Sequence, residues 1–110
     1  MSSVGVKRDR PAAVEAAVGR WAAELHRRPE VVRVVWFGSR VAGIPTPGSD
    51  VDLCVVLRSS TKPWRERIPD YLPGAFPVGV DLFPFTEEEL ERLRGESPGW
   101  HAAIARGREV

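Results

Sequence analysis

The sequence of 110 residues contains little cysteine, almost no net charge and no long apolar run. Cys54 is its only cysteine, which leaves no disulfide framework and is typical of a buried thiol in a reducing compartment. The 16 basic and 15 acidic residues nearly cancel, so overall charge indicates no nucleic-acid or membrane partner. No window reaches the ~18 apolar residues of a spanning helix. We therefore expect a cytoplasmic protein without membrane association or direct nucleic-acid binding.

The length of the chain fits one hydrophobic core and leaves no room for a separate substrate domain. Residues 1–10 contain several basic side chains but no apolar stretch after them, so we expect a flexible leader there. Residues 11–110 are expected to form a single domain.

Several segments carry helix signals. Apolar residues repeat at helical spacing from Pro11 to about Leu25 and again between roughly 63 and 72. Thr86 and Glu89 form a capping box, which predicts a helix that begins directly after Thr86. A last helix is predicted over 97–106, with serine as N-cap and proline at the first helical position.

Three runs rich in β-branched and aromatic residues have strand length: Val31–Phe37, Asp50–Leu57 and Val78–Phe83. A short helical turn at 39–42 and an irregular loop rich in proline and glycine are expected between the first two. This order predicts an α+β fold, a small mixed β-sheet with helices packed mainly on one face. The opposite face would be open for chemistry.

Acidic residues lie in or beside two of these apolar strands. Asp50 and Asp52 are two positions apart, so their side chains share one face of a strand. The apolar neighbours Val80 and Leu82 must face the core, which turns Asp81 to the other face. If the second and third strands are neighbours, the three carboxylates converge.

A single aspartate in such a place is best interpreted as a solvated residue, but three together are harder to explain in that way. Carboxylates about 5 Å apart repel by roughly 3 kcal/mol per pair at an effective dielectric near 20. A divalent cation compensates this repulsion, and a set of carboxylates suits Mg²⁺ or Mn²⁺ better than zinc. We therefore predict that Asp50, Asp52 and Asp81 are catalytic metal ligands.

The first strand ends at Gly38-Ser39, in a turn whose backbone N–H groups could hold a phosphate. Taken alone, these two residues fit an ordinary strand-ending turn at least as well. Their spacing of ten residues from Asp50 favours a phosphate site that faces a metal site. Arg40 could also reach a phosphate, although a solvated arginine is an equally good interpretation.

The sequence contains Gly38-Ser39, then ten further residues, then Asp50-Val51-Asp52, with Asp81 on a later strand. This pattern resembles the signature of the DNA polymerase β type nucleotidyltransferases. At this length the chain is similar to the minimal nucleotidyltransferases. Members of that group are often encoded beside a small helical protein of the HEPN type, with which they form toxin and antitoxin pairs.

The resemblance implies a role for each of these residues. Gly38 and Ser39 would hold the β- and γ-phosphates of ATP, and Asp50 and Asp52 would bind two Mg²⁺ ions. Asp81 would complete the site for the ion that activates the acceptor hydroxyl. The reaction would transfer AMP in line to a hydroxyl of a partner protein, with the chain acting as the antitoxin of a HEPN protein.

Two alternatives to a protein-modifying enzyme remain open. The chain could be a non-catalytic antitoxin that neutralises its partner by binding, or it could modify a small molecule of the aminoglycoside kind. The remaining aromatic and imidazole residues point to neither. His26 and His101 are interpreted as surface or packing residues, and the tryptophans on helical stripes as core or interface residues rather than base-stacking platforms: Trp21, Trp64 and Trp100.

Overall fold

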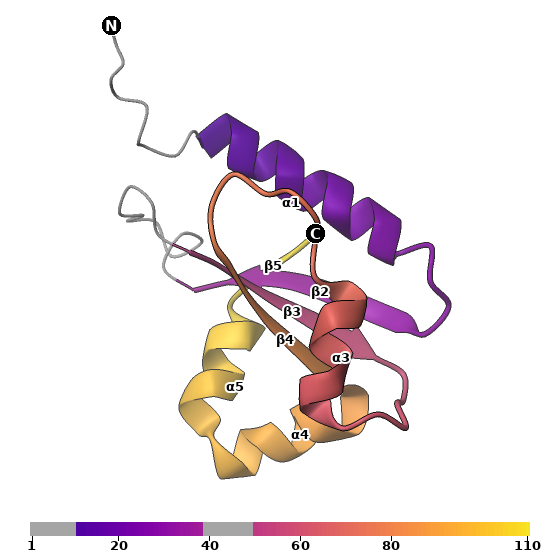
Figure 1. Cartoon of the computed structure of the whole chain (residues 1–110). Coiled ribbons are helices and arrows are strands. Elements are labelled where there is room, and N and C mark those ends of the chain that lie inside the picture. Colours follow the sequence, from indigo (N-terminus) through magenta and orange to yellow (C-terminus); the bar gives the residue numbers. More distant parts are fainter. Residues whose placement is uncertain (1–10, 39–49) are drawn as a thin grey trace, which may run out of the picture.

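A computed structural model describes residues 11–38 and 50–110. Within these residues lie four helices and four strands (Figure 1). They are α1 (Pro11–Leu25), β2 (Val31–Phe37), β3 (Val51–Leu57), α3 (Trp64–Tyr71), β4 (Val80–Thr86), α4 (Glu87–Glu96), α5 (Pro98–Ala105) and β5 (Arg108–Glu109). The leader predicted at 1–10 and the turn predicted at 39–42, with Ser39 and Arg40, lie outside the described residues.

The strands form one mixed sheet in the order β4-β3-β2-β5. β3 pairs with β2 in antiparallel and with β4 in parallel orientation, and β5 pairs with β2 in antiparallel orientation. The prediction of an α+β fold with a small mixed sheet is therefore confirmed. β3 is buried along nearly its whole length, as expected of a strand that has neighbours on both sides and cover on both faces.

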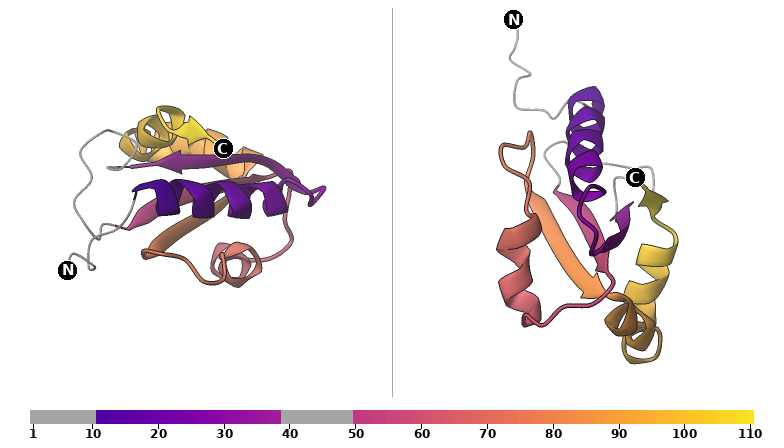
Figure 2. Two further views of the ribbon diagram at one scale, coloured as in Figure 1. Left: turned by 90° about the horizontal axis from the view of Figure 1, so that it is seen from above. Right: turned by 90° about the vertical axis from the view of Figure 1, so that its right-hand side faces the viewer.

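The helices divide between the two faces of the sheet, whereas the sequence suggested that they pack mainly on one. α1 covers one face, and α4 and α5 cover the other (Figure 2). Alternate residues of β3 feed the two cores: Leu53 and Val55 pack on the α1 side, and Cys54 and Val56 on the α4/α5 side. Because both sets are apolar, both faces need cover. α3 lies along the edge strand β4 (Figure 1).

The third strand begins later and ends later than the predicted Val78–Phe83, because β4 runs through Pro84 to Thr86. Proline cannot donate to a strand ladder, but β4 is an edge strand, where no such donor is needed. The outward-facing carbonyl of Pro84 accepts a hydrogen bond of 3.0 Å from Nη1 of Arg67 in α3. The proline therefore fits the edge without disturbing the pairing with β3.

The ends of the C-terminal helices follow the predicted signals closely. The capping box is confirmed: the Thr86 hydroxyl accepts from the Glu89 N–H, and the Glu89 carboxylate accepts from the Thr86 N–H. Ser97 and Pro98 start α5 as predicted, although the Ser97 side chain makes no capping hydrogen bond. The two-residue strand β5 was not predicted, because a charged pair carries no strand pattern. It completes the sheet beside β2.

Candidate active site

Two of the three predicted metal ligands lie side by side on the central strands. Asp52 of β3 and Asp81 of β4 are direct partners in the parallel register. Their neighbours Leu53 and Leu82 are buried in the core on the α1 side, so both aspartates point to the α4/α5 side. The sequence-based expectation that these two strands are neighbours and that both carboxylates share a face is confirmed.

Asp50 immediately precedes β3 and lies opposite Gly79, the residue before β4. The Val51 N–H donates to the Gly79 carbonyl at 2.9 Å, which continues the parallel pairing up to this point. A Cβ atom on Gly79 would collide with Oδ1 of Asp50. The missing side chain of Gly79 therefore makes the space that the Asp50 carboxylate occupies, on the same face as Asp52 and Asp81.

Gly38, at the end of β2, makes the corresponding space for Asp52. Its φ of 93° lies in the left-handed region that favours glycine. A Cβ atom there would also collide with Oδ2 of Asp52. Two predicted site residues, a glycine and a carboxylate, thus lie against each other, because the side of Gly38 that a Cβ atom would occupy faces the Asp52 carboxylate.

The carboxylates form a locally negative group. Burial raises the pKa of Asp52, and the nearby charges of Asp81 and Asp50 raise it further. Asp52 is half-buried, whereas Asp50 and Asp81 are exposed and open to solvent. The charges of the other two aspartates therefore act on Asp52, as expected of residues that share one site.

The donor chemistry fits a hard divalent cation such as Mg²⁺ or Mn²⁺. Carboxylate oxygens are the ligands that these ions prefer, and a cation would relieve the repulsion that raises the Asp52 pKa. In residues 11–38 and 50–110, no three His, Cys, Asp or Glu side chains are grouped closely enough to hold a metal ion as they stand.

A hollow of about 370 Å³ opens beside Asp52. Asp52 and Gly38 line it, together with residues of α5. Its remaining lining residues are Phe37, Gly99, Trp100 and Ala103. The hollow is the part of the α4/α5 face where a ligand could contact Asp52 and an apolar surface together.

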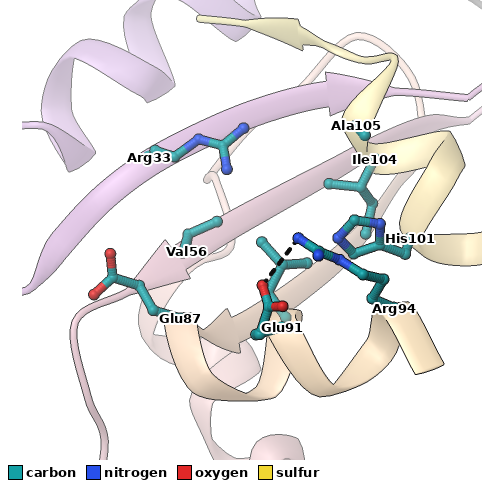
Figure 3. A pocket seen from close by; sticks show the side chains of 9 residues that line it. Arg33, Val56, Glu87, Glu91, Arg94, His101, Ile104 and Ala105 are labelled. Atoms are coloured by element: carbon teal, nitrogen blue, oxygen red, sulfur yellow. Dashed lines mark hydrogen bonds and ion pairs between the residues drawn. The ribbon is translucent and has the colours of Figure 1, made fainter. Parts of the chain in front are cut away.

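A second hollow of about 420 Å³ lies further along the same face, between α4, α5 and the strands β2 and β3 (Figure 3). One ion pair lies within it, between Arg94 and Glu91, and a further lining residue, Arg33, is paired with Glu109, which does not line the hollow. Arg94 donates to Glu91 at 3.2 Å, and Arg33 donates to Glu109 at 2.8 Å. His101 also lines this second hollow and does not line the hollow that contains Asp52. Because opposite charges meet here, we interpret this hollow as a structural feature of the surface.

Cys54 follows Asp52 on the same strand face but is fully buried as a free thiol. Burial raises its pKa to about 12, so it stays protonated near neutral pH. This confirms the prediction of a buried thiol and argues against a cysteine nucleophile.

Two residues of this region were not predicted as part of the site. Gly79 had a recognisable signal, since glycine is unusual in a strand and often marks a close approach. Trp100 had none, because its helical spacing predicted a packing role, whereas the indole is 48% exposed beside Asp52. Ser39 and Arg40 lie outside the described residues, and their predicted phosphate contacts stay predictions.

Among the described residues, no helix is both long and apolar enough to cross a membrane. Comparison with curated proteins and with solved structures gives no match. The family model of the nucleotidyltransferase domain matches residues 20–99, which run from the C-terminal part of α1 to the start of α5 and include Gly38 and all three aspartates. Most of the chain is thus covered, and the chain belongs to the nucleotidyltransferase domain family.

Proposed function

We propose that this protein is a Mg²⁺-dependent nucleotidyltransferase that transfers AMP from ATP to a hydroxyl group of a partner protein. The family supports nucleotidyl transfer from a nucleoside triphosphate in general terms. The observation that carries the proposal is the parallel register of Asp52 with Asp81, with Asp50 on the same face. Mn²⁺ could replace Mg²⁺ at such a site.

Each carboxylate has a role in the proposed reaction. Asp50 and Asp52 would hold two Mg²⁺ ions, and Asp81 would complete the site nearest the acceptor and take the proton of its hydroxyl group. When bound, the ions would neutralise phosphate charge and lower the pKa of that hydroxyl. The acceptor oxygen forms a bond to the α-phosphorus while the bond from that phosphorus to the bridging oxygen breaks, and pyrophosphate leaves.

The triphosphate would lie against the turn at the end of β2. Gly38 has no side chain and a left-handed backbone, so a phosphate can approach its backbone closely. Ser39 and Arg40, which follow it in the sequence, are proposed to bind the β- and γ-phosphates.

We further propose that the partner is a HEPN-type protein and that the chain serves as the antitoxin of the pair. The support is the resemblance of this short chain to minimal nucleotidyltransferases and the small size of the domain, which offers little surface for a separate small-molecule site. Labelled ATP, Mg²⁺ and the product of the neighbouring gene should together yield a labelled partner. Asp52→Asn should abolish the label, and Asp70→Asn, which changes an exposed and ion-paired carboxylate of α3, should not.

Other outcomes would favour the alternative functions. A variant with Asp50, Asp52 and Asp81 all changed to Asn that still neutralises the partner fully would indicate an antitoxin that acts by binding. Modification of aminoglycosides in a panel assay would indicate a small-molecule acceptor. Labelling of the partner that persists in Asp52→Asn would contradict the proposed metal site itself.

A further inference from the structure

Trp100 is a large aromatic side chain left half-exposed on the face that carries the aspartates. Trp21, also predicted to be a packing residue, is indeed buried at 6% exposure, but Trp100 is 48% exposed. Its ring lies against two others, with centroids 5.1 Å from Phe83 and 6.1 Å from Phe37. These two contacts hold the indole in place while about half of its surface stays free.

The free part of the indole lies at the hollow that Asp52 and Gly38 also line. On α5 its neighbours along the hollow are Gly99 and Ala103, and Ala103 is three positions on and therefore on the same helix face. Both are small, so the indole dominates that side. A ligand in this hollow can therefore meet both an aromatic surface and the carboxylate of Asp52.

We propose that Trp100 is the stacking platform for the base of the nucleoside triphosphate. This inference rests on the proposed function, which places the triphosphate at Gly38 and Asp52. A base is joined to those phosphates through a single ribose, so it must lie within a short reach of them. The hollow provides the adjoining apolar space with an aromatic ring. Stacking on a tryptophan suits every base, because each one has a π-face.

The test compares a ligand that has a base with one that has none. Calorimetric titrations in Mg²⁺ would measure the dissociation constants of ATP and of inorganic tripolyphosphate for the wild type, Trp100→Ala and Trp100→Phe. We expect Trp100→Ala to weaken ATP binding on the order of tenfold. Tripolyphosphate binding should change less than about twofold by the same reasoning, and Trp100→Phe should retain most of the ATP affinity.

A matched control removes another exposed apolar side chain. Leu72, the C-cap of α3, is 45% exposed and does not line the hollow, so Leu72→Ala should leave both dissociation constants unchanged. Circular dichroism melting of each variant would show that it is folded before it is titrated.

Three results would overturn the inference. The first two reject the stacking role alone, and the third also rejects the proposed function. If Trp100→Ala weakened the binding of ATP and of tripolyphosphate by the same factor, the indole would only support the phosphate site. Unchanged ATP binding with a raised KM for the acceptor would mean that the hollow holds the acceptor. If the wild type bound neither ATP nor tripolyphosphate, the proposed function would fail together with the stacking role.

Discussion

Asp52 and Glu89 are two partly buried carboxylates whose pKa values are moved in opposite directions. The Arg67 hydrogen bond, more than any other contact, lowers the pKa of Glu89 to about 2. Burial, followed by Asp81 and Asp50, raises the pKa of Asp52. The fold neutralises the first charge with a cation of its own, whereas it surrounds the second with like charges. This difference separates a carboxylate that stabilises the structure from one suited to bind an external cation.

The surroundings of Glu89 explain its structural role. Arg67 is 4% exposed and binds both carboxylate oxygens, at 2.6 and 2.9 Å. The same guanidinium donates to the Pro84 carbonyl at 3.0 Å and to the Lys62 carbonyl at 2.9 Å. Glu89 also accepts from the Thr86 N–H as part of the capping box. One ion pair therefore joins α3, the edge strand β4 and the start of α4.

The largest expected effect is on catalysis. Asp52→Asn should lower kcat/KM for nucleotidyl transfer about a thousandfold or more, because a metal site supplies several kcal/mol of charge stabilisation. Its free energy of unfolding at pH 7 should not fall, because the change removes a half-buried charge that its neighbours repel. Glu89→Gln should show the reverse, with lower stability and unchanged activity of the folded enzyme. A greater loss of stability in Asp52→Asn than in Glu89→Gln would break the comparison.

The second effect is on stability. Arg67→Ala leaves the Glu89 carboxylate without its partner, and breaking a buried pair in this way costs about 3–5 kcal/mol. Urea denaturation at pH 7 would measure the free energy of unfolding. Lys62→Ala, which removes the exposed pair with Asp70, should cost no more than about 1 kcal/mol. Equal losses in the two variants would mean that burial does not distinguish the pairs.

A smaller effect is expected at the glycine beside Asp50. The methyl group of Gly79→Ala would collide with the Asp50 carboxylate and turn it, so Mn²⁺ affinity should fall about tenfold. Gly74→Ala is the matched control, because its Cβ would meet no atom within 4 Å. Electron paramagnetic resonance titration of free Mn²⁺ would measure the Mn²⁺ affinity of both variants. Equal affinities in the two variants would place Asp50 outside the metal site.

The smallest effect is on the pH dependence of stability. The pKa of Glu89 is lowered from 4.5 to about 2, so its stabilising contribution is complete above about pH 5 and is lost as the pH falls toward about 2. The raised pKa of Asp52 has the opposite sign, because its unfavourable contribution disappears as the pH falls. From pH 5 to 3, unfolding free energy should therefore fall less in Glu89→Gln than in the wild type, and more in Asp52→Asn. Urea denaturation at several pH values would measure this change in the free energy of unfolding for each variant.

Sequence patterns predicted the elements where the signal is local. The capping box of Thr86 and Glu89 and the strand at Val31–Phe37 are found as predicted, because a cap needs only four residues and this strand only its own run of β-branched and aromatic residues. Sequence patterns failed to predict elements whose formation depends on a neighbouring strand. Pro84 lies within a strand because β4 is an edge, and β5 forms because β2 offers it an edge to join.

The alternation of apolar residues, read from the sequence alone, determined which face Asp52 and Asp81 occupy, because side chains along a strand alternate with a period of two. Only the tertiary structure decided that these aspartates are partners in one parallel register, because that depends on how the crossover through α3 returns the chain to the sheet. The same holds for the exposed face of Trp100 beside Asp52. A helical repeat indicates that a side chain meets a neighbour, but which part of the ring is then left free depends on the packing of α5 against the sheet.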